Sequence, residues 1–109
     1  MRLLSALLVS LLLVSPASAN YLSAKTLLAM FESSNEKVVA SAIGYIIGQH
    51  DATYGVVHCI KKGYDAEDLV NMVKISMTMH VQAKPETADK EAAWHIQQIL
   101  SAVAPCKRT

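Results

Sequence analysis

The residues with the greatest chemical potential lie close together in the stretch GQHDATYGVVHC, from Gly48 to Cys59, which holds two histidines, an aspartate, a tyrosine and a cysteine. Cys59 with His50 or His58 has the composition of a thiol nucleophile and its base. Histidine, aspartate and cysteine also bind metals such as zinc. Sequence neighbours such as His58 and Cys59 rarely bind one ion together, and the sequence has no C-x-x-C or H-x-x-x-H pair. We therefore expect no metal site from His50, Asp51, His58 and Cys59.

The chemistry of Cys59 depends on the compartment, and the N-terminus predicts that compartment. The chain opens MRLLSALLVSLLLVSPASA, with a positive charge at Arg2, a short apolar run over 3–14 and an A-x-A sequence at 17–19. This order is typical of a secretory signal peptide cut after Ala19. We therefore expect residues 1–19 to be removed and residues 20–109 to form one domain in the periplasm.

The charge balance excludes several classes of partner. Removal of Arg2 with the signal peptide leaves basic and acidic residues in equal number. A nucleic-acid-binding surface needs a basic excess, so we expect no nucleic acid partner. The apolar N-terminal run is too short for a stable membrane span, so we expect none after cleavage.

The two cysteines of the chain, Cys59 and Cys106, are most simply explained by a disulfide. An even number of cysteines in a small exported protein indicates a bridge. On the loop-entropy model, a bridge that encloses about half the domain contributes roughly 4 kcal/mol to stability. An oxidised Cys59 has no thiolate, so we expect no cysteine nucleophile.

Other catalytic patterns have simpler explanations. Asp65, Glu67 and Asp68 resemble paired carboxylates for glycoside hydrolysis, but at a helix start they cap the backbone and favour the helix dipole. The sequence has no G-x-S-x-G motif and no phosphate-binding glycine loop. The histidines His80 and His95 fall on separate predicted helices and are expected at the surface or at the boundary of the core. We therefore expect neither an enzyme nor a cofactor.

Four helices account for the apolar pattern. The first runs from Tyr21 to about Glu32, and the second follows a capping-box pattern at Ser33 and Glu36. The third follows Asp65 as N-cap and ends before Pro85, and the fourth covers about 87–103. The predicted fold class is all-α, a compact bundle of about four helices joined by one disulfide between the ends of the second and fourth helices.

Small and large side chains on these helices mark contact surfaces. Gly44 and Gly48 lie one turn apart and leave a strip where another helix, in this chain or in a second copy, can approach closely. Met72 and Met77 fit the core stripe of the third helix, whereas Met79 falls off it. Trp94 departs from the alanine-rich face of the fourth helix, where it either anchors an interface or covers the end of the core.

The order of these features resembles the Rap1a/Tai family, small periplasmic immunity proteins against amidase effectors of type VI secretion. The matching positions cover about 33–106, and the motif residues are Gly44, Tyr45, Gly48, Asp51, Ala52, Cys59, Pro85, Glu86, Pro105 and Cys106. Among these residues, Gly44, Tyr45 and Gly48 are the positions that we expect to pack against another helix.

The resemblance implies a protein that inhibits by binding. Such a protein covers the active site of a peptidoglycan amidase and needs no catalytic residue, and members are often homodimers. The polar, proline-broken segment 80–91 is the first candidate for the contact, and the turn Lys61–Asp65 is the second. The residues predicted to bind the partner are His80, Gln82, Lys84, Pro85, Glu86 and Asp89.

Two other functions remain open from the sequence. An acid-activated periplasmic chaperone is also small, helical and held by one disulfide, and the four histidines would add positive charge below about pH 5. A periplasmic enzyme would use His50, Asp51 or His58.

Overall fold

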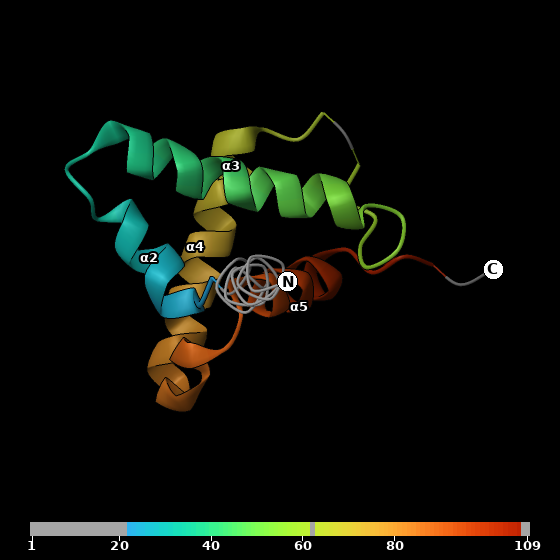
Figure 1. Ribbon diagram of the computed structural model, residues 1–109. Helices are drawn as coiled ribbons and strands as arrows, with labels where there is room; N and C mark the ends of the chain where they lie inside the picture. Colours follow the sequence, from blue (N-terminus) through green and yellow to red (C-terminus); the bar gives the residue numbers. More distant parts are fainter. Residues whose placement is uncertain (1–21, 62, 108–109) are drawn as a thin grey trace, which may run out of the picture.

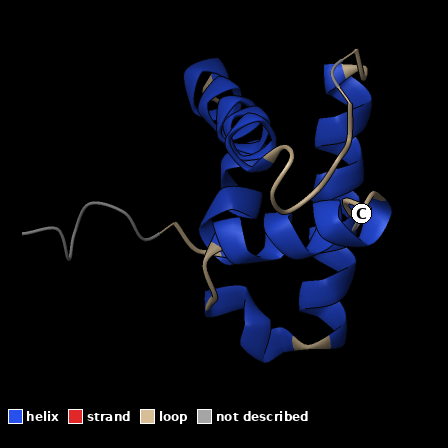
Figure 2. Cartoon of the chain, turned by 90° about the vertical axis from the view of Figure 1, so that its right-hand side faces the viewer, coloured by secondary structure: helices blue, strands red, loops and turns tan. Residues whose placement is uncertain are grey.

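The computed structural model describes residues 22–61 and 63–107, which fold into four α-helices and one short 3-10 helix (Figure 1). The signal peptide predicted at 1–19 lies outside these residues. The helices are α2 (Ala24–Phe31), α3 (Glu36–Thr53), α4 (Ala66–Ala83), η2 (Pro85–Asp89) and α5 (Ala92–Val103). This part of the chain contains no β-strand, and short loops connect most of the helices (Figure 2). The predicted all-α fold with four helices is confirmed.

The helices α3 and α4 begin directly after a side chain that accepts a hydrogen bond from a backbone N–H of the first turn. Asp65 caps α4 as predicted, with its carboxylate accepting from the Asp68 N–H at 3.2 Å. At α3 the predicted capping box is wrong. Asn35 is the N-cap and accepts from the Lys37 N–H at 3.0 Å, while the Ser33 hydroxyl accepts from the Asn35 N–H. Glu36 is then the first residue of the helix, where it cannot reach back over the cap.

The fourth helix begins later than the sequence predicts. Pro85 opens η2, and the chain is extended at Lys90 and Glu91 before α5 begins at Ala92. Hydrogen bonds to residues at the start of α2 hold this break in place. The Ala92 N–H donates to the Leu22 carbonyl at 2.7 Å, and the Ala24 N–H donates to the Lys90 carbonyl at 2.9 Å. The entry to α2 therefore pairs with the entry to α5.

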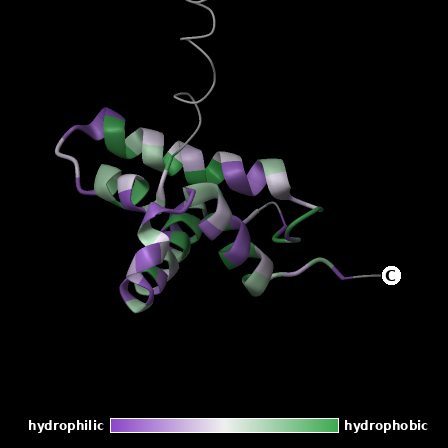
Figure 3. Ribbon diagram, turned by 60° about the horizontal axis from the view of Figure 1, so that its bottom comes forward, coloured by the Kyte–Doolittle hydropathy of each residue, from purple (hydrophilic) through white to green (hydrophobic). Residues whose placement is uncertain are grey.

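The core forms where the inner faces of the four helices meet. Polar and apolar residues alternate along each helix, as amphipathic helices require (Figure 3). Met77 is fully buried and Met72 partly buried, so their predicted core positions are confirmed. The fully buried apolar side chains with the largest volumes are Leu27, Ile46, Val73, Met77, Ile96 and Leu100.

The outer face of α3 is open. A Cβ atom built on Gly44 or Gly48 meets nothing within 4 Å, so no described helix approaches closely there, and the predicted packing at these glycines is wrong within the chain. Tyr45, between them in sequence, does pack against the core. Among the described helices, none combines the length and apolarity needed to cross a membrane.

The disulfide joins Cys59 to Cys106, as predicted, with 4.9 Å between the two Cα atoms. The prediction that Cys59 stands at a helix end needs correction. Helix α3 ends at Thr53, and a turn with Gly55 in the left-handed region (φ 83°) carries the chain on to Cys59. The bridge therefore connects two loops, one after α3 and one after α5.

Candidate functional site

The chemically rich stretch forms a closed hydrogen-bonded cluster. His50 and His58 are both fully buried. His58 accepts from the Ile60 N–H at Nδ1 (3.1 Å), and its Nε2–H donates to the His50 carbonyl (2.8 Å). These partners fix His58 as the neutral tautomer with its proton on Nε2, because a backbone N–H can only donate and a carbonyl can only accept.

Both ring nitrogens of His50 face acceptors, whereas those of His58 face one donor and one acceptor. Its Nδ1 faces a carboxylate oxygen of Asp51 at 3.0 Å, and its Nε2 faces the Ile60 carbonyl at 3.1 Å. Both partners are acceptors, and the His50 ring donates to each of them only through a nitrogen that carries a proton. The ring also contacts His58 and Tyr64, with centroids 4.5 and 4.3 Å away. Burial, with Asp51 as a second cause, raises the pKa of Tyr64.

This cluster positions Cys59. The ring nitrogens of both histidines have partners, and Cys59 is oxidised. The Cys59 N–H donates to the Ala104 carbonyl at 2.8 Å, which aligns the two loops that the bridge joins. Across the described part of the chain, no group of three or more histidine, cysteine or acidic residues could hold a metal ion. The stretch holds the loop that carries Cys59 in place.

A second aromatic cluster lies where α4 turns into α5. We call residues 79–94 the α4–α5 corner: the last turn of α4, η2 and the first residues of α5. It forms the orange end of the ribbon at the bottom of Figure 1. Beneath it, His95 Nε2–H donates to the Thr87 carbonyl at 2.8 Å, and the buried Thr87 hydroxyl donates to the Lys84 carbonyl at 2.7 Å. The corner is therefore held by bonds to its own backbone.

The expectation that His95 lies at the surface or at the core boundary is wrong. Its side chain is fully buried and its Nδ1 has no hydrogen-bond partner. The sequence could not show this, because the ring of His95 is enclosed by residues of other elements, among them His80 on α4 and Thr87 on η2. His80 is half-buried and lies against His95, with 5.2 Å between the ring centroids.

Trp94 is the large aromatic side chain on the surface of the corner, where it remains 36% exposed. Its ring meets His95 at 4.9 Å and His80 at 6.1 Å between centroids, and the Lys90 ammonium lies 4.4 Å from its centroid. These contacts on several sides hold the indole in place while leaving part of it open to a partner. Met79, one residue before His80, is 64% exposed.

The structure brings the predicted partner-binding residues together on this corner. All of them except His80 are exposed: Gln82, Lys84, Pro85, Glu86 and Asp89. Met79 and Trp94 belong with them but were not part of the predicted set. Their signal in the sequence was that each departs from the apolar stripe of its helix. The second candidate, the turn at 61–65, includes residue 62, which lies outside the described residues.

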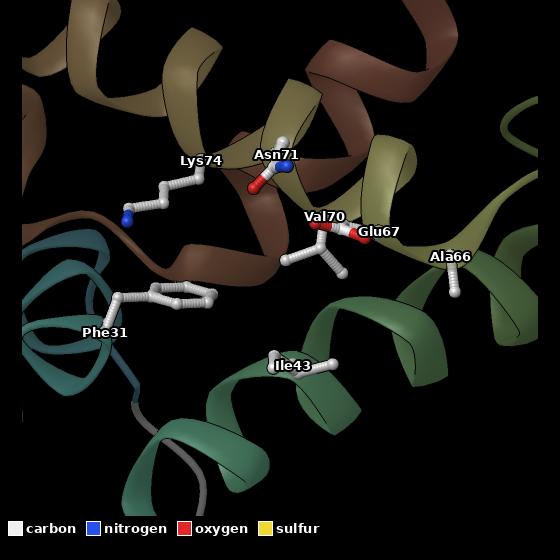
Figure 4. Close-up of a pocket in the computed structure, with 7 residues that line it drawn as sticks. All are labelled: Phe31, Ile43, Ala66, Glu67, Val70, Asn71 and Lys74. Atoms are coloured by element: carbon white, nitrogen blue, oxygen red, sulfur yellow. The ribbon is translucent and has the colours of Figure 1, made fainter. Parts of the chain in front are cut away.

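A groove lies away from the corner, between the N-terminal half of α4, the middle of α3 and the end of α2. Its volume is about 390 Å³. Phe31, Ile43 and Val70 form its apolar walls, and Glu67 and Lys74 stand on α4 beside it (Figure 4).

No protein-family model matches the sequence, and no curated protein matches it. The resemblance to the Rap1a/Tai family therefore rests on the motif residues themselves and stays a prediction.

Proposed function

We propose that this protein acts in the periplasm by binding another protein through the α4–α5 corner, and that the partner is a peptidoglycan amidase whose activity it blocks. The observation that carries the proposal is Trp94, a partly exposed aromatic ring held by its neighbours. Interfaces concentrate their binding energy in a few such residues, most often Trp, Tyr and Arg.

The surroundings of Trp94 fit an interface. The exposed thioether of Met79 adds an adaptable apolar contact. The same corner exposes polar side chains at Gln82, Lys84 and Glu86, and a polar rim is usual in a protein interface. Because the corner is fixed from inside by the His95 and Thr87 hydrogen bonds, little conformational entropy is lost when a partner binds.

The amidase is named because the motif residues resemble those of immunity proteins. An inhibitor that occupies the active site of an enzyme needs a projecting surface and no catalytic group of its own. The corner supplies that surface, and the closed histidine cluster at the other end of the molecule supplies no free base.

The test is inhibition of amidase activity. The oxidised protein is titrated into a purified type VI amidase effector that digests cell-wall fragments. We expect stoichiometric inhibition, and we expect Trp94→Ala to weaken it at least about tenfold, a hot-spot effect. Tyr54→Ala serves as the matched control, because Tyr54 is an exposed aromatic residue at the opposite end. Equal inhibition by both variants would exclude the corner as the interface.

An acid-activated chaperone is the second candidate, and His58 is the observation that favours it. A protonated His58 cannot accept the Ile60 N–H, so acid removes one of the bonds that hold the loop of Cys59. Loosening this loop would expose apolar helix faces to unfolded clients. Circular dichroism and light scattering between pH 7 and pH 3 test this candidate. Unchanged helicity and unchanged size at pH 3 would exclude it.

A further inference from the structure

We propose that the groove beside α4 binds a straight-chain fatty acid, with the carboxylate at Lys74 and the chain along the apolar walls. This ligand site is separate from the α4–α5 corner and goes beyond the proposed inhibition of an amidase.

The shape of the groove fits a linear chain. Figure 4 shows Lys74, Asn71, Val70, Glu67 and Ala66 following one another along α4 above Phe31 and Ile43. From Ala66 to Lys74 the helix rises roughly 12 Å, about the length of an extended chain of eight to ten carbons. A volume of about 390 Å³ and mainly apolar walls are typical of a small-molecule site.

The ammonium of Lys74 determines that the head group of the ligand is an anion. Its ammonium lies 5.1 Å from the centroid of Phe31, and the residue is half-buried at one end of the groove. Within the described residues, no carboxylate lies within ion-pair distance of this ammonium. A half-buried cation over an apolar ring gains more from an anion than a fully hydrated cation does. The site therefore selects a carboxylate at this end.

Glu67 determines the direction in which the fatty acid lies in the groove. It stands nearer the other end of the groove and is exposed, so water already solvates its charge. Its negative charge disfavours a carboxylate beside it and leaves Lys74 as the place for the head group. Asn71, between the two, has an amide that can donate a second hydrogen bond to the ligand.

The experiment is a calorimetric titration of the oxidised full chain with decanoate, in detergent-free buffer and below the micelle concentration. We expect saturable binding of one decanoate, weaker binding of 1-decanol, and the weakest binding of decyltrimethylammonium. Lys74→Met keeps the apolar stem over Phe31 but removes the charge, and we expect it to weaken decanoate binding about tenfold or more. Lys25→Met is the control, because Lys25 is an exposed lysine in the first turn of α2 and does not line the groove. Its affinity should match that of the unmodified protein.

Three results would overturn the proposal: no saturable binding, equal affinity for the cationic and anionic amphiphiles, or undiminished decanoate binding by Lys74→Met. Sedimentation with Ile43→Glu provides one more test. If the unmodified protein is a dimer that does not bind decanoate, and Ile43→Glu is a monomer, then a second copy of the chain covers the groove. Amidase inhibition by Lys74→Met should stay normal, so failure of the fatty-acid site and failure of the proposed function can be told apart.

Discussion

Each end of the molecule places two histidines beside aromatic rings, and the two ends use them differently. After α3, the ring nitrogens of His50 and His58 have partners, and the disulfide ties the loop to the C-terminal segment. At the α4–α5 corner, His95 keeps one nitrogen without a partner, and Trp94 remains partly exposed. The comparison shows that residue type alone does not mark a site. What separates the two ends is that the histidine nitrogens after α3 all have partners within the chain, whereas the corner leaves the indole of Trp94 partly exposed, as the proposed binding surface requires.

The largest expected effect is the loss of stability when the disulfide at the first of these ends is removed. Replacing both cysteines with alanine removes a bridge between residues 47 positions apart in the sequence. The loop-entropy model gives a loss of about 4 kcal/mol in the free energy of unfolding. Urea denaturation of the variant and the oxidised protein measures this difference. A loss below about 1 kcal/mol would show that the His50–His58 cluster holds the loop without the bridge.

The next effect compares one histidine from each end. His58→Ala removes a fully buried ring and both of its hydrogen bonds, so we expect it to destabilise the protein by about 3 kcal/mol. His80→Ala, at the half-buried ring of the corner, should cost about 1 kcal/mol or less. The same denaturation experiment gives both values. Equal losses would remove the distinction between scaffold and surface.

A smaller effect concerns the open face of α3. Gly44→Ala adds a methyl group where nothing lies within 4 Å, inside a helix that glycine disfavours. We expect a gain of about 0.5–1 kcal/mol in the free energy of unfolding, with no change in oligomeric state. A loss of stability together with dissociation on sedimentation would instead place a second copy of the chain on this face.

The smallest effect is a dependence on alkaline pH. The pKa of Tyr45 is raised above its ordinary value of 10.0, mainly by burial and then by the charge of Glu91, against a backbone hydrogen bond at Ala93. The folded protein thus holds this proton more tightly than the unfolded chain. The resulting stability is fully present below about pH 10 and is lost as the pH rises through the higher folded pKa. Tyr45→Phe should reduce this loss in denaturation curves recorded from pH 9 to pH 11. An identical pH dependence in the variant would contradict it.

Local patterns in the sequence predicted much of the fold. Apolar spacing located the four helices, and Asp65 was identified as an N-cap because its carboxylate acts within three residues of the chain. The paired cysteines predicted the bridge for the same kind of reason, since only one intramolecular pairing was available.

Features that depend on distant backbone were missed. The start of α5 is fixed by hydrogen bonds to Leu22 and Ala24, and the burial of His95 is fixed by the Thr87 carbonyl. The openness at Gly44 depends on which face of α3 meets its neighbours. At Asn35 the failure was local, because Ser33 and Asn35 are both good caps and only the path of the chain selects between them. The groove at Lys74 joins three helices and had no signal in the sequence.

Affinity capture tests the central claim most directly. The oxidised protein, its Trp94→Ala variant and its Tyr54→Ala variant are immobilised separately and exposed to the same periplasmic and secreted extracts at pH 7. Bound proteins are identified by mass spectrometry, and peptidoglycan hydrolysis by each eluted enzyme is assayed with and without added protein. We predict that the unmodified and Tyr54→Ala columns retain one peptidoglycan amidase that the protein inhibits, and that the Trp94→Ala column does not. Retention of no cell-wall hydrolase, or equal retention by all three columns, would contradict the assignment of the α4–α5 corner as an inhibitory surface.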